Sequence, residues 1–135
     1  MSASNDFETD LLELIFHKVD LPNLGSGDND VVIALHTADP GEGGTQATSE
    51  AAYTGYARQS VARIVGNWQI IGNNAANTGE IAFPQATGGS ETLTHFSIGR
   101  AGGGIILSGA LSASLAVSAG VTPKFAAGQL VATAN

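Results

Sequence analysis

The sequence contains no cysteine and few charged or aromatic side chains. The absence of cysteine among its 135 residues excludes a disulfide framework and thiol chemistry. Charged residues make up only 13% of the chain and aromatic residues 6%, whereas about a quarter of a typical globular domain is charged. No apolar run approaches the roughly 18 residues that a membrane-spanning helix needs, and no signal-peptide pattern is visible. We therefore expect a protein made in a cytoplasm, without a membrane partner.

Small and apolar residues take the place of the missing charges. The chain has 18 glycines and is 43% hydrophobic, and its length fits one domain with a core of its own. This composition favours a β-rich fold. Its surface is either simply uncharged or covered by neighbouring molecules, and the composition does not decide between the two.

Acidic residues are concentrated in the first part of the chain. Residues 1–50 hold ten acidic side chains and one basic side chain, whereas residues 51–135 hold two acidic and four basic ones. The net charge of −7 argues against a nucleic-acid partner, because a phosphate backbone requires a basic surface. The acidic half of one copy could instead meet the weakly basic half of another, which predicts salt-sensitive self-association.

One amphipathic helix is expected over residues 5–18. Asn5 and Glu8 resemble a capping box, and Pro22 prevents the helix from continuing. Apolar side chains recur at helical spacing; these are Phe7, Leu11, Leu12, Leu14, Ile15 and Phe16. Such a broad apolar face must be covered, either by the sheet of its own chain or by a neighbouring subunit.

The rest of the chain reads as eight or nine short strands separated by turn signals. The expected strands cover residues 31–35, 56–65, 68–71, 80–83, 92–98, 105–107 or 105–111, 115–118, 125–126 and 130–133. Gly66-Asn67 indicates a hairpin between the second and third of them. The first strand and the strand at 105–107 are apolar on both faces and are expected to be central.

This spacing of strands is typical of an all-β fold. We predict an antiparallel β-sandwich, jelly-roll-like or immunoglobulin-like, with one N-terminal α-helix. Residues 25–135 would form the sandwich domain, and residues 1–24 would form the helix and a connector packed on it.

No motif in the sequence predicts an active site. Asp28 and Asp30 could offer oxygen ligands to calcium, but their spacing does not match a calcium-binding loop. His17, His36 and His95 lack the spacing of a zinc site, and His36 is expected to be a hydrogen-bonded structural residue. A Ser–His–Asp arrangement formed only in three dimensions stays open, without a nucleophile motif to support it. We therefore predict no enzyme activity, no cofactor and no metal site.

Candidate contacts with partner molecules come from the polar loop after the first strand and from nearby charged and aromatic residues. The candidates are Asp39, Glu42, Tyr53, Tyr56, Arg58 and Arg100. The acids could meet basic patches on a partner. The two tyrosines and Trp68 could form a platform for a sugar ring, although packing in the core is the simpler role for aromatic side chains.

Four segments together carry a resemblance to a known family. They read SNDFETDLLELIFHKVDLPNL (Ser4–Leu24), ALHTADPGEGGTQATSEAAYTGYAR (Ala34–Arg58), FPQATGGSETLTHFSIG (Phe83–Gly99) and SGALSASLAVSAGVTPKFAAGQL (Ser108–Leu130). In these segments the chain resembles small virion proteins of tailed bacteriophages, which are tail-fibre-like or head decoration (cement) proteins. The resemblance implies a β-sandwich with an N-terminal helix, and it implies no catalytic residue.

The resemblance also implies a structural role in the virion. Our main expectation is a decoration protein on the capsid surface that bridges and stabilises subunits of the major capsid protein. Other copies of the same chain would be further partners, in a homo-oligomer on the particle, with neither nucleic acid nor a membrane involved. The alternative is a tail-fibre or tail-tip component that takes part in host attachment. In either case the protein would be made in the cytoplasm of the host bacterium.

Overall fold

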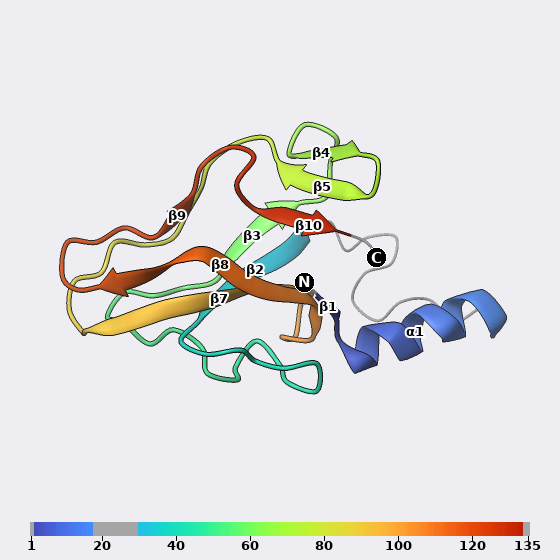
Figure 1. Cartoon of the computed structure of the whole chain (residues 1–135), viewed down its shortest axis with the longest axis horizontal. Coiled ribbons are helices and arrows are strands. Elements are labelled where there is room, and N and C mark those ends of the chain that lie inside the picture. Colours follow the sequence, from blue (N-terminus) through green and yellow to red (C-terminus); the bar gives the residue numbers. More distant parts are fainter. Residues whose placement is uncertain (1, 18–29, 134–135) are drawn as a thin grey trace.

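The computed structural model describes residues 2–17 and 30–133 (Figure 1). Within these residues the protein is mostly β, with antiparallel sheets and a short N-terminal helix, α1 (Asn5–Phe16). The strands are β1 (Ser2–Ala3), β2 (Asp30–His36), β3 (Gln59–Ala62), β4 (Trp68–Ile71), β5 (Asn74–Asn77), β6 (Ile81–Ala82), β7 (Glu91–Gly99), β8 (Ile105–Val117), β9 (Lys124–Phe125) and β10 (Val131–Thr133). The predicted combination of antiparallel strands with one helix near the N-terminus is confirmed for this part of the chain.

The largest sheet contains five strands in the order β1-β8-β7-β2-β3, all paired antiparallel. The two strands predicted to be central, β2 and the start of β8, both lie inside this sheet. The register places Ile33 opposite Ile98 and Leu35 opposite Phe96. Ile33 and Leu35 on one face and Ala34 on the other are all buried, as expected for a strand that is apolar on both faces.

The hydrophobic core joins the five-stranded sheet to two smaller sheets, β10-β5-β4 and β6-β9. Phe96 of β7 meets Phe125 of β9 edge to face, with ring centroids 5.8 Å apart. Phe83, which follows β6, also contacts Phe125, at 6.4 Å between centroids. Leu93 is fully buried in the same cluster, and burying a side chain of this size contributes about 1.5–3 kcal/mol. Aromatic contacts of this kind hold the short strands against the large sheet.

Several strand boundaries differ from the prediction. The predicted strands at 105–107 and 115–118 are one continuous strand, β8, because β7 pairs with it along nearly its whole length. The predicted strand at 56–65 is too long, since β3 covers only Gln59–Ala62. The predicted hairpin at Gly66-Asn67 is wrong, because the strands on its two sides belong to different sheets. The observed hairpin joins β4 to β5. Its turn contains Gly72 at φ 60°, a conformation that glycine adopts without strain.

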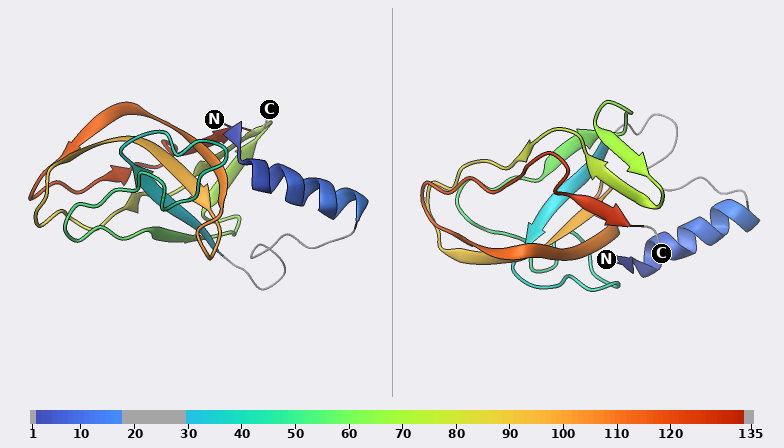
Figure 2. Two further views of the ribbon diagram at one scale, coloured as in Figure 1. Left: turned by 90° about the horizontal axis from the view of Figure 1, so that it is seen from below. Right: turned by 45° about the horizontal axis from the view of Figure 1, so that its top comes forward.

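Helix α1 begins at the expected residue but uses a different cap. The backbone N–H of Phe7 donates to Ser4 Oγ over 3.2 Å, so Ser4 is the N-cap, and the predicted pair of Asn5 and Glu8 is not the capping arrangement. The main-chain N–H of Ser4 also donates to the carbonyl of Ile106 in β8 over 3.1 Å. Figure 2 shows the consequence: the start of α1 lies against the sheet, and its far end projects beyond the body of strands.

Other parts of the prediction concern residues or features that the structure does not test. Residues 18–29, which include most of the predicted connector at 24–30 and the calcium candidate Asp28, lie outside the described residues. The division at residues 24 and 25, and a jelly-roll-like or immunoglobulin-like sandwich topology, stay predictions. No helix in the described residues is long and apolar enough to cross a membrane.

Candidate functional site

The loop between β2 and β3 folds back on the five-stranded sheet and inserts one polar side chain into it. Gln46, in this loop, is fully buried. Its Nε2 donates to the carbonyl of Val32 in β2 over 2.8 Å and to Ser97 Oγ in β7 over 3.3 Å. Its main-chain N–H donates to the carbonyl of Gly103 over 2.9 Å. The loop is thus fixed to two strands and to the turn before β8.

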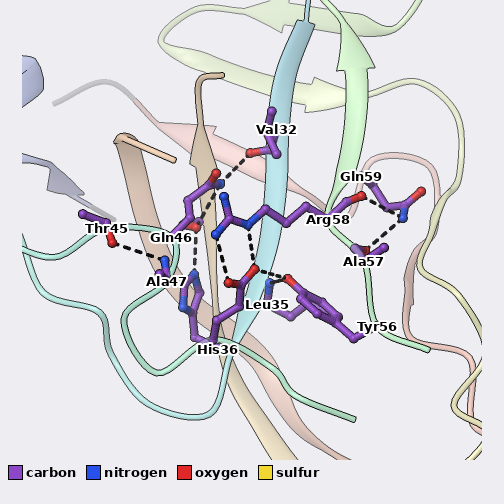
Figure 3. A network of polar contacts seen from close by, with 12 residues as sticks. Val32, Leu35, His36, Thr45, Gln46, Ala47, Tyr56, Ala57, Arg58 and Gln59 are labelled. Carbon is purple, nitrogen blue, oxygen red and sulfur yellow. Dashed lines mark hydrogen bonds and ion pairs between the residues drawn. The ribbon is translucent and has the colours of Figure 1, made fainter. Parts of the chain in front are cut away.

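His36, the last residue of β2, links the same loop to β7. Its Nδ1 lies 2.8 Å from the carbonyl of Thr48, and its Nε2 lies 2.8 Å from Ser97 Oγ. A carbonyl can only accept, so Nδ1 carries the proton and Nε2 accepts from the Ser97 hydroxyl. Figure 3 shows Gln46 and His36 side by side next to β2. The predicted structural role of His36 is confirmed.

A second group of polar side chains lies beside His36 and is centred on Glu50. Glu50 Oε1 accepts from Arg58 Nε over 2.6 Å and from the Tyr56 hydroxyl over 3.0 Å, and Oε2 accepts from Arg58 Nη2 over 2.9 Å. The Tyr56 oxygen in turn accepts from the N–H of Leu35 over 3.1 Å. Figure 3 shows the side chains of Tyr56 and Arg58 directed toward the same point beside β2. The bidentate pair is a strong arrangement, since it combines opposite charge with two aligned hydrogen bonds.

These surroundings shift the pKa values of the groups in both clusters. Burial lowers the pKa of His36, more than its hydrogen bond with Thr48 raises it, so the ring is neutral. Burial alone would raise the pKa of Glu50, but the hydrogen bonds from Arg58 and Tyr56 outweigh it and hold this pKa below its ordinary value. Burial and the Glu50 charge raise the pKa of Tyr56. All three side chains therefore keep one protonation state near neutral pH.

Ser97 and His36 are hydrogen-bonded as the nucleophile and the base of a hydrolase are, but neither side chain is accessible to a substrate. Both residues are 0% exposed. The Ser97 oxygen is already engaged by Gln46. A substrate carbonyl could not approach the hydroxyl without unfolding the loop, and catalysis requires such an approach. Of the Ser–His–Asp arrangement that the sequence left open, a Ser–His pair forms, and its role is structural.

The six candidate contact residues do not form one surface. Asp39 and Glu42 are exposed in the loop after β2, where Asp39 Oδ1 accepts from the N–H of Gly41 over 2.9 Å. Arg100 is buried and its Nη1 lies 2.6 Å from Asp10 Oδ2 in α1. Arg58 is occupied by Glu50, as described above. Of the six, only the two acids are exposed, and which residues touch a partner stays a prediction.

The aromatic candidates belong to the core and do not form a platform. Tyr53 is 3% exposed, and its hydroxyl donates to the carbonyl of Pro84 over 2.8 Å. Its ring meets Tyr56 edge to face at 5.4 Å, and Tyr56 stacks on Phe83 at 6.2 Å between centroids. Trp68 is partly buried and packs against the same core. The rings of Tyr53 and Tyr56 therefore pack against other aromatic side chains, whereas Trp68 also lines an apolar groove.

An apolar groove lies between the β10-β5-β4 sheet and the five-stranded sheet. It has a volume of about 440 Å³ and is lined by apolar side chains from both sheets and from the loop before β4. Three of these are largely in solvent: Ile64 is 57% exposed, Val65 93% and Ile70 75%. Exposed apolar patches of this kind on folded proteins mark interaction sites. Sequence reasoning missed this groove, because its residues come from separate strands.

No metal centre is formed by the residues that the structure describes. Among them, no group of three or more His, Cys, Asp or Glu side chains could hold an ion. Asp30, the described member of the calcium candidate pair, is exposed at the start of β2. The polar groups that do converge are held by one another in the two clusters around His36 and Glu50.

These observations define a β-rich protein whose converging polar groups brace the fold and whose distinctive surface is apolar. The sequence matches the family described as Podophage GP4 fiber I protein gp80 over residues 2–133, and the chain belongs to this family. It is a structural protein of a phage virion, from a family of fibres, and not an enzyme. None of the curated proteins matches the chain in sequence.

The family match favours the tail-fibre expectation over the capsid-decoration expectation. The sequence favoured capsid decoration and kept a tail fibre as the alternative. A fibre family supports the alternative better than the main expectation. Composition could not separate the two, because low charge, many small residues and a β-fold suit any protein that packs among other virion subunits.

Proposed function

We propose that the protein is a component of a podophage tail fibre and takes part in host attachment, either in the fibre or at the tail tip. The observation that carries this proposal is the match to a fiber I family over residues 2–133, nearly the entire chain. The chain's polar clusters and core suit the role, since both brace a body of antiparallel sheets. In such a fibre the chain works by binding, with no chemical step.

The partners in this proposal are other copies of the chain and neighbouring proteins of the virion. The exposed apolar groove supplies a surface of the kind that subunits bury. Several copies on one particle would turn modest single contacts into firm attachment, because linked binding events reinforce one another. This explains how a small domain can serve a fibre without a large interface of its own.

Contact with the host would use polar loops in this proposal, because the rings of Tyr53 and Tyr56 pack in the core. Asp39 and Glu42 are exposed on the loop after β2. Their carboxylates would suit basic groups or bridging cations on a cell surface. Gln46 and His36 hold this loop in a fixed shape, which reduces the entropy cost of binding.

Labelled antibodies on purified particles test the location. A fibre component places the label on the tail and occurs in few copies, and antibody fragments against it slow adsorption to host cells. Label spread over the head, with a copy number comparable to that of the major capsid protein, would instead support capsid decoration. A gel of purified particles gives the copy number directly.

A further inference from the structure

Strand β4 is an open edge of the β10-β5-β4 sheet. It is one of the two outer strands of this sheet, and Figure 1 shows it on the side of the β4–β5 hairpin away from β10. None of its four residues, Trp68–Ile71, is charged or proline. Proteins commonly protect an exposed edge with charged side chains, with proline or with a covering segment, because an open edge is a template for another strand.

The main-chain groups of Ile70 point away from β5, along this edge. Beside the hairpin, Thr78 N–H donates to the carbonyl of Asn67 over 2.9 Å, so the main chain of Asn67 faces the β5 side. Trp68 points the opposite way, and its N–H donates to the carbonyl of Ile64 over 3.3 Å. Because alternate residues of an antiparallel strand bond to the same neighbour, Ile70 faces the same way as Trp68. The Ile64 carbonyl occupies the edge at Trp68, and the open position is Ile70.

The outer edge of β3, in the five-stranded sheet, is covered where β4 is not. The carbonyl of Ala62, at the end of β3, accepts from Asn67 Nδ2 and from Trp68 Nε1, each over 3.2 Å. Among the residues that the structure describes, no side chain or loop bonds to the main chain of Ile70. The fold thus satisfies one sheet edge with its own side chains and leaves the other with a free donor and acceptor.

Apolar side chains lie in water on both faces of β4. Ile70 is 75% exposed and Ile71 is 66% exposed. As neighbours in a strand they point to opposite faces, and of the two only Ile70 lines the apolar groove. A partner packed on one face would leave the other isoleucine in water, whereas a strand beside β4 contacts both. The free main chain and the exposure of both faces therefore select an extended strand as the occupant.

A second copy of β4 meets each requirement of this edge. It is extended, and it has the same open main chain and the same two exposed isoleucines. Residues 64–79 contain no charged side chain, so two copies of a chain with a net charge of −7 can meet here without placing like charges opposite each other. Antiparallel pairing about a twofold axis occupies both open edges at once, whereas an unrelated strand would satisfy the edge of one copy only.

We propose that β4 pairs antiparallel with β4 of a second copy of this chain, with Ile70 opposite Ile70 of that copy. Each Ile70 N–H then donates to the Ile70 carbonyl of the other copy, and Ile71 lies opposite Gln69. The two three-stranded sheets become one continuous sheet. The contact is isologous, so it closes at the dimer. The inference concerns assembly and does not depend on where the protein sits in the virion.

Hydrogen exchange of the full-length chain, followed by NMR, measures the proposed bond directly. Sedimentation velocity should show mostly monomer at about 10 µM and dimer at about 300 µM. Between these concentrations exchange of the Ile70 amide should slow at least about fivefold, because pairing removes it from water. The Gln69 amide faces β5 within its own chain and is the internal control, since its protection should change much less.

Two substitutions separate the main-chain bond from the side chain. Ile70→Pro removes the outward N–H, which β5 does not use, and should weaken dimerisation at least about tenfold. Ile70→Val keeps both the N–H and an apolar side chain and should change dimerisation by about threefold or less. Slow exchange of the Gln69 amide in each variant shows that the hairpin is still folded.

Disulfide formation tests the register, since the chain has no cysteine of its own. In Ile70→Cys the two Cα atoms would lie about 5.5 Å apart, within reach of a disulfide, so oxidation should link two chains. In the matched control Ile71→Cys they would lie about 8 Å apart, which is too far, so little linked dimer should form.

A monomeric wild type at the higher concentration would overturn the proposal. Dimers in which the Ile70 amide stays unprotected would also overturn it, because they would show two faces packed together without strand pairing. Equal linkage of the two cysteine variants would contradict the register, and rows longer than a dimer would contradict the twofold contact. None of these results would bear on the tail location, which the antibody label tests separately.

Discussion

His36 Nε2 and Ser97 Oγ lie 2.8 Å apart and join β2 to β7 through a hydrogen bond that is shielded from water. The two residues sit on neighbouring strands of the five-stranded sheet, and both are fully buried. Gln46 and Thr48 from the loop complete the bonding of this pair. A buried polar network of this kind favours one arrangement of loop and sheet, because separating the loop from the sheet would leave the His36 ring and the Ser97 hydroxyl without these partners.

Removing the Ser97 hydroxyl should destabilise the fold. In Ser97→Ala the Nε2 atom of His36 loses its donor and Gln46 loses one acceptor inside the sheet. Leaving buried polar groups unsatisfied costs about 1–3 kcal/mol. Urea denaturation should therefore show a drop of this size in the free energy of unfolding. Ser112→Ala, at an exposed position of β8, is the control and should change it by less than about 0.5 kcal/mol.

Stability should fall in two stages as the solution becomes acidic. The lowered pKa of His36 means that the unfolded chain takes up a proton near its ordinary value of about 6.5 while the folded chain resists it, so stability decreases below that pH. The lowered pKa of Glu50 adds a second decrease below about pH 4.3, where the unfolded chain protonates this group first. Thermal unfolding across a pH series measures both stages.

Substitution of His36 tests whether this residue causes the first decrease in stability, the one expected below its ordinary pKa. His36→Gln should flatten the change in melting temperature between about pH 7 and pH 5, even though its stability at neutral pH is lower. His17→Gln, at an exposed position, should retain the wild-type slope. An unchanged slope in the His36 variant would show that the buried imidazole does not set this part of the pH dependence.

Gly99 should not tolerate even a methyl group. A Cβ at this position would lie 2.5 Å from Gln46 Cδ and 2.6 Å from the carbonyl oxygen of Gly104. The backbone oxygen cannot move aside cheaply, so Gly99→Ala should cost about 1–3 kcal/mol through overpacking. Gly79→Ala is the matched control, since its Cβ would meet nothing within 4 Å. Equal stabilities of the two variants, compared by chemical denaturation, would contradict the close packing of Gln46 on the sheet.

The ion pair of Asp10 and Arg100 should stabilise the attachment of α1 to the rest of the fold. Both side chains are largely buried, with 16% and 8% exposure. Breaking such a pair by changing one partner leaves the other charge poorly compensated. In Asp10→Asn, hydrogen exchange of the α1 amides should accelerate at least about tenfold while exchange in β7 stays slow. Asp6→Asn removes an exposed acid from the same helix and should leave the exchange rates near those of wild type.

The elements that sequence reasoning located are those with a strong local pattern. The run Val31–Leu35 is apolar at every position, and β2 contains it with one more residue at each end. Trp68–Ile71 was predicted with the bounds that β4 has. The spacing of Phe7 and Leu11 found the helix, since apolar residues at that interval share one face. Local periodicity was sufficient to locate an element wherever the sequence of that one segment determines which of its faces is buried.

The remaining features depend on distant parts of the chain. The strand Asn74–Asn77 has no apolar alternation, and it exists because β4 and β10 pair with its two edges. The cap Ser4 was overlooked in favour of Asn5 because both residue types cap helices. The site was less predictable still: Gln46 and His36 both bond to Ser97 on a distant strand, and the contacts of Glu50 with Tyr56 and Arg58 lie within one irregular loop that has no regular spacing. No local pattern marks such partners before the sheet is formed.

A density map of the whole virion tests the fibre assignment most directly. The account predicts that the five-stranded body, with the sheets β10-β5-β4 and β6-β9 attached to it, fits density in the fibres at the tail. If the body fitted instead into density on the outer surface of the head, between subunits of the major capsid protein, the assignment to a fibre would be contradicted.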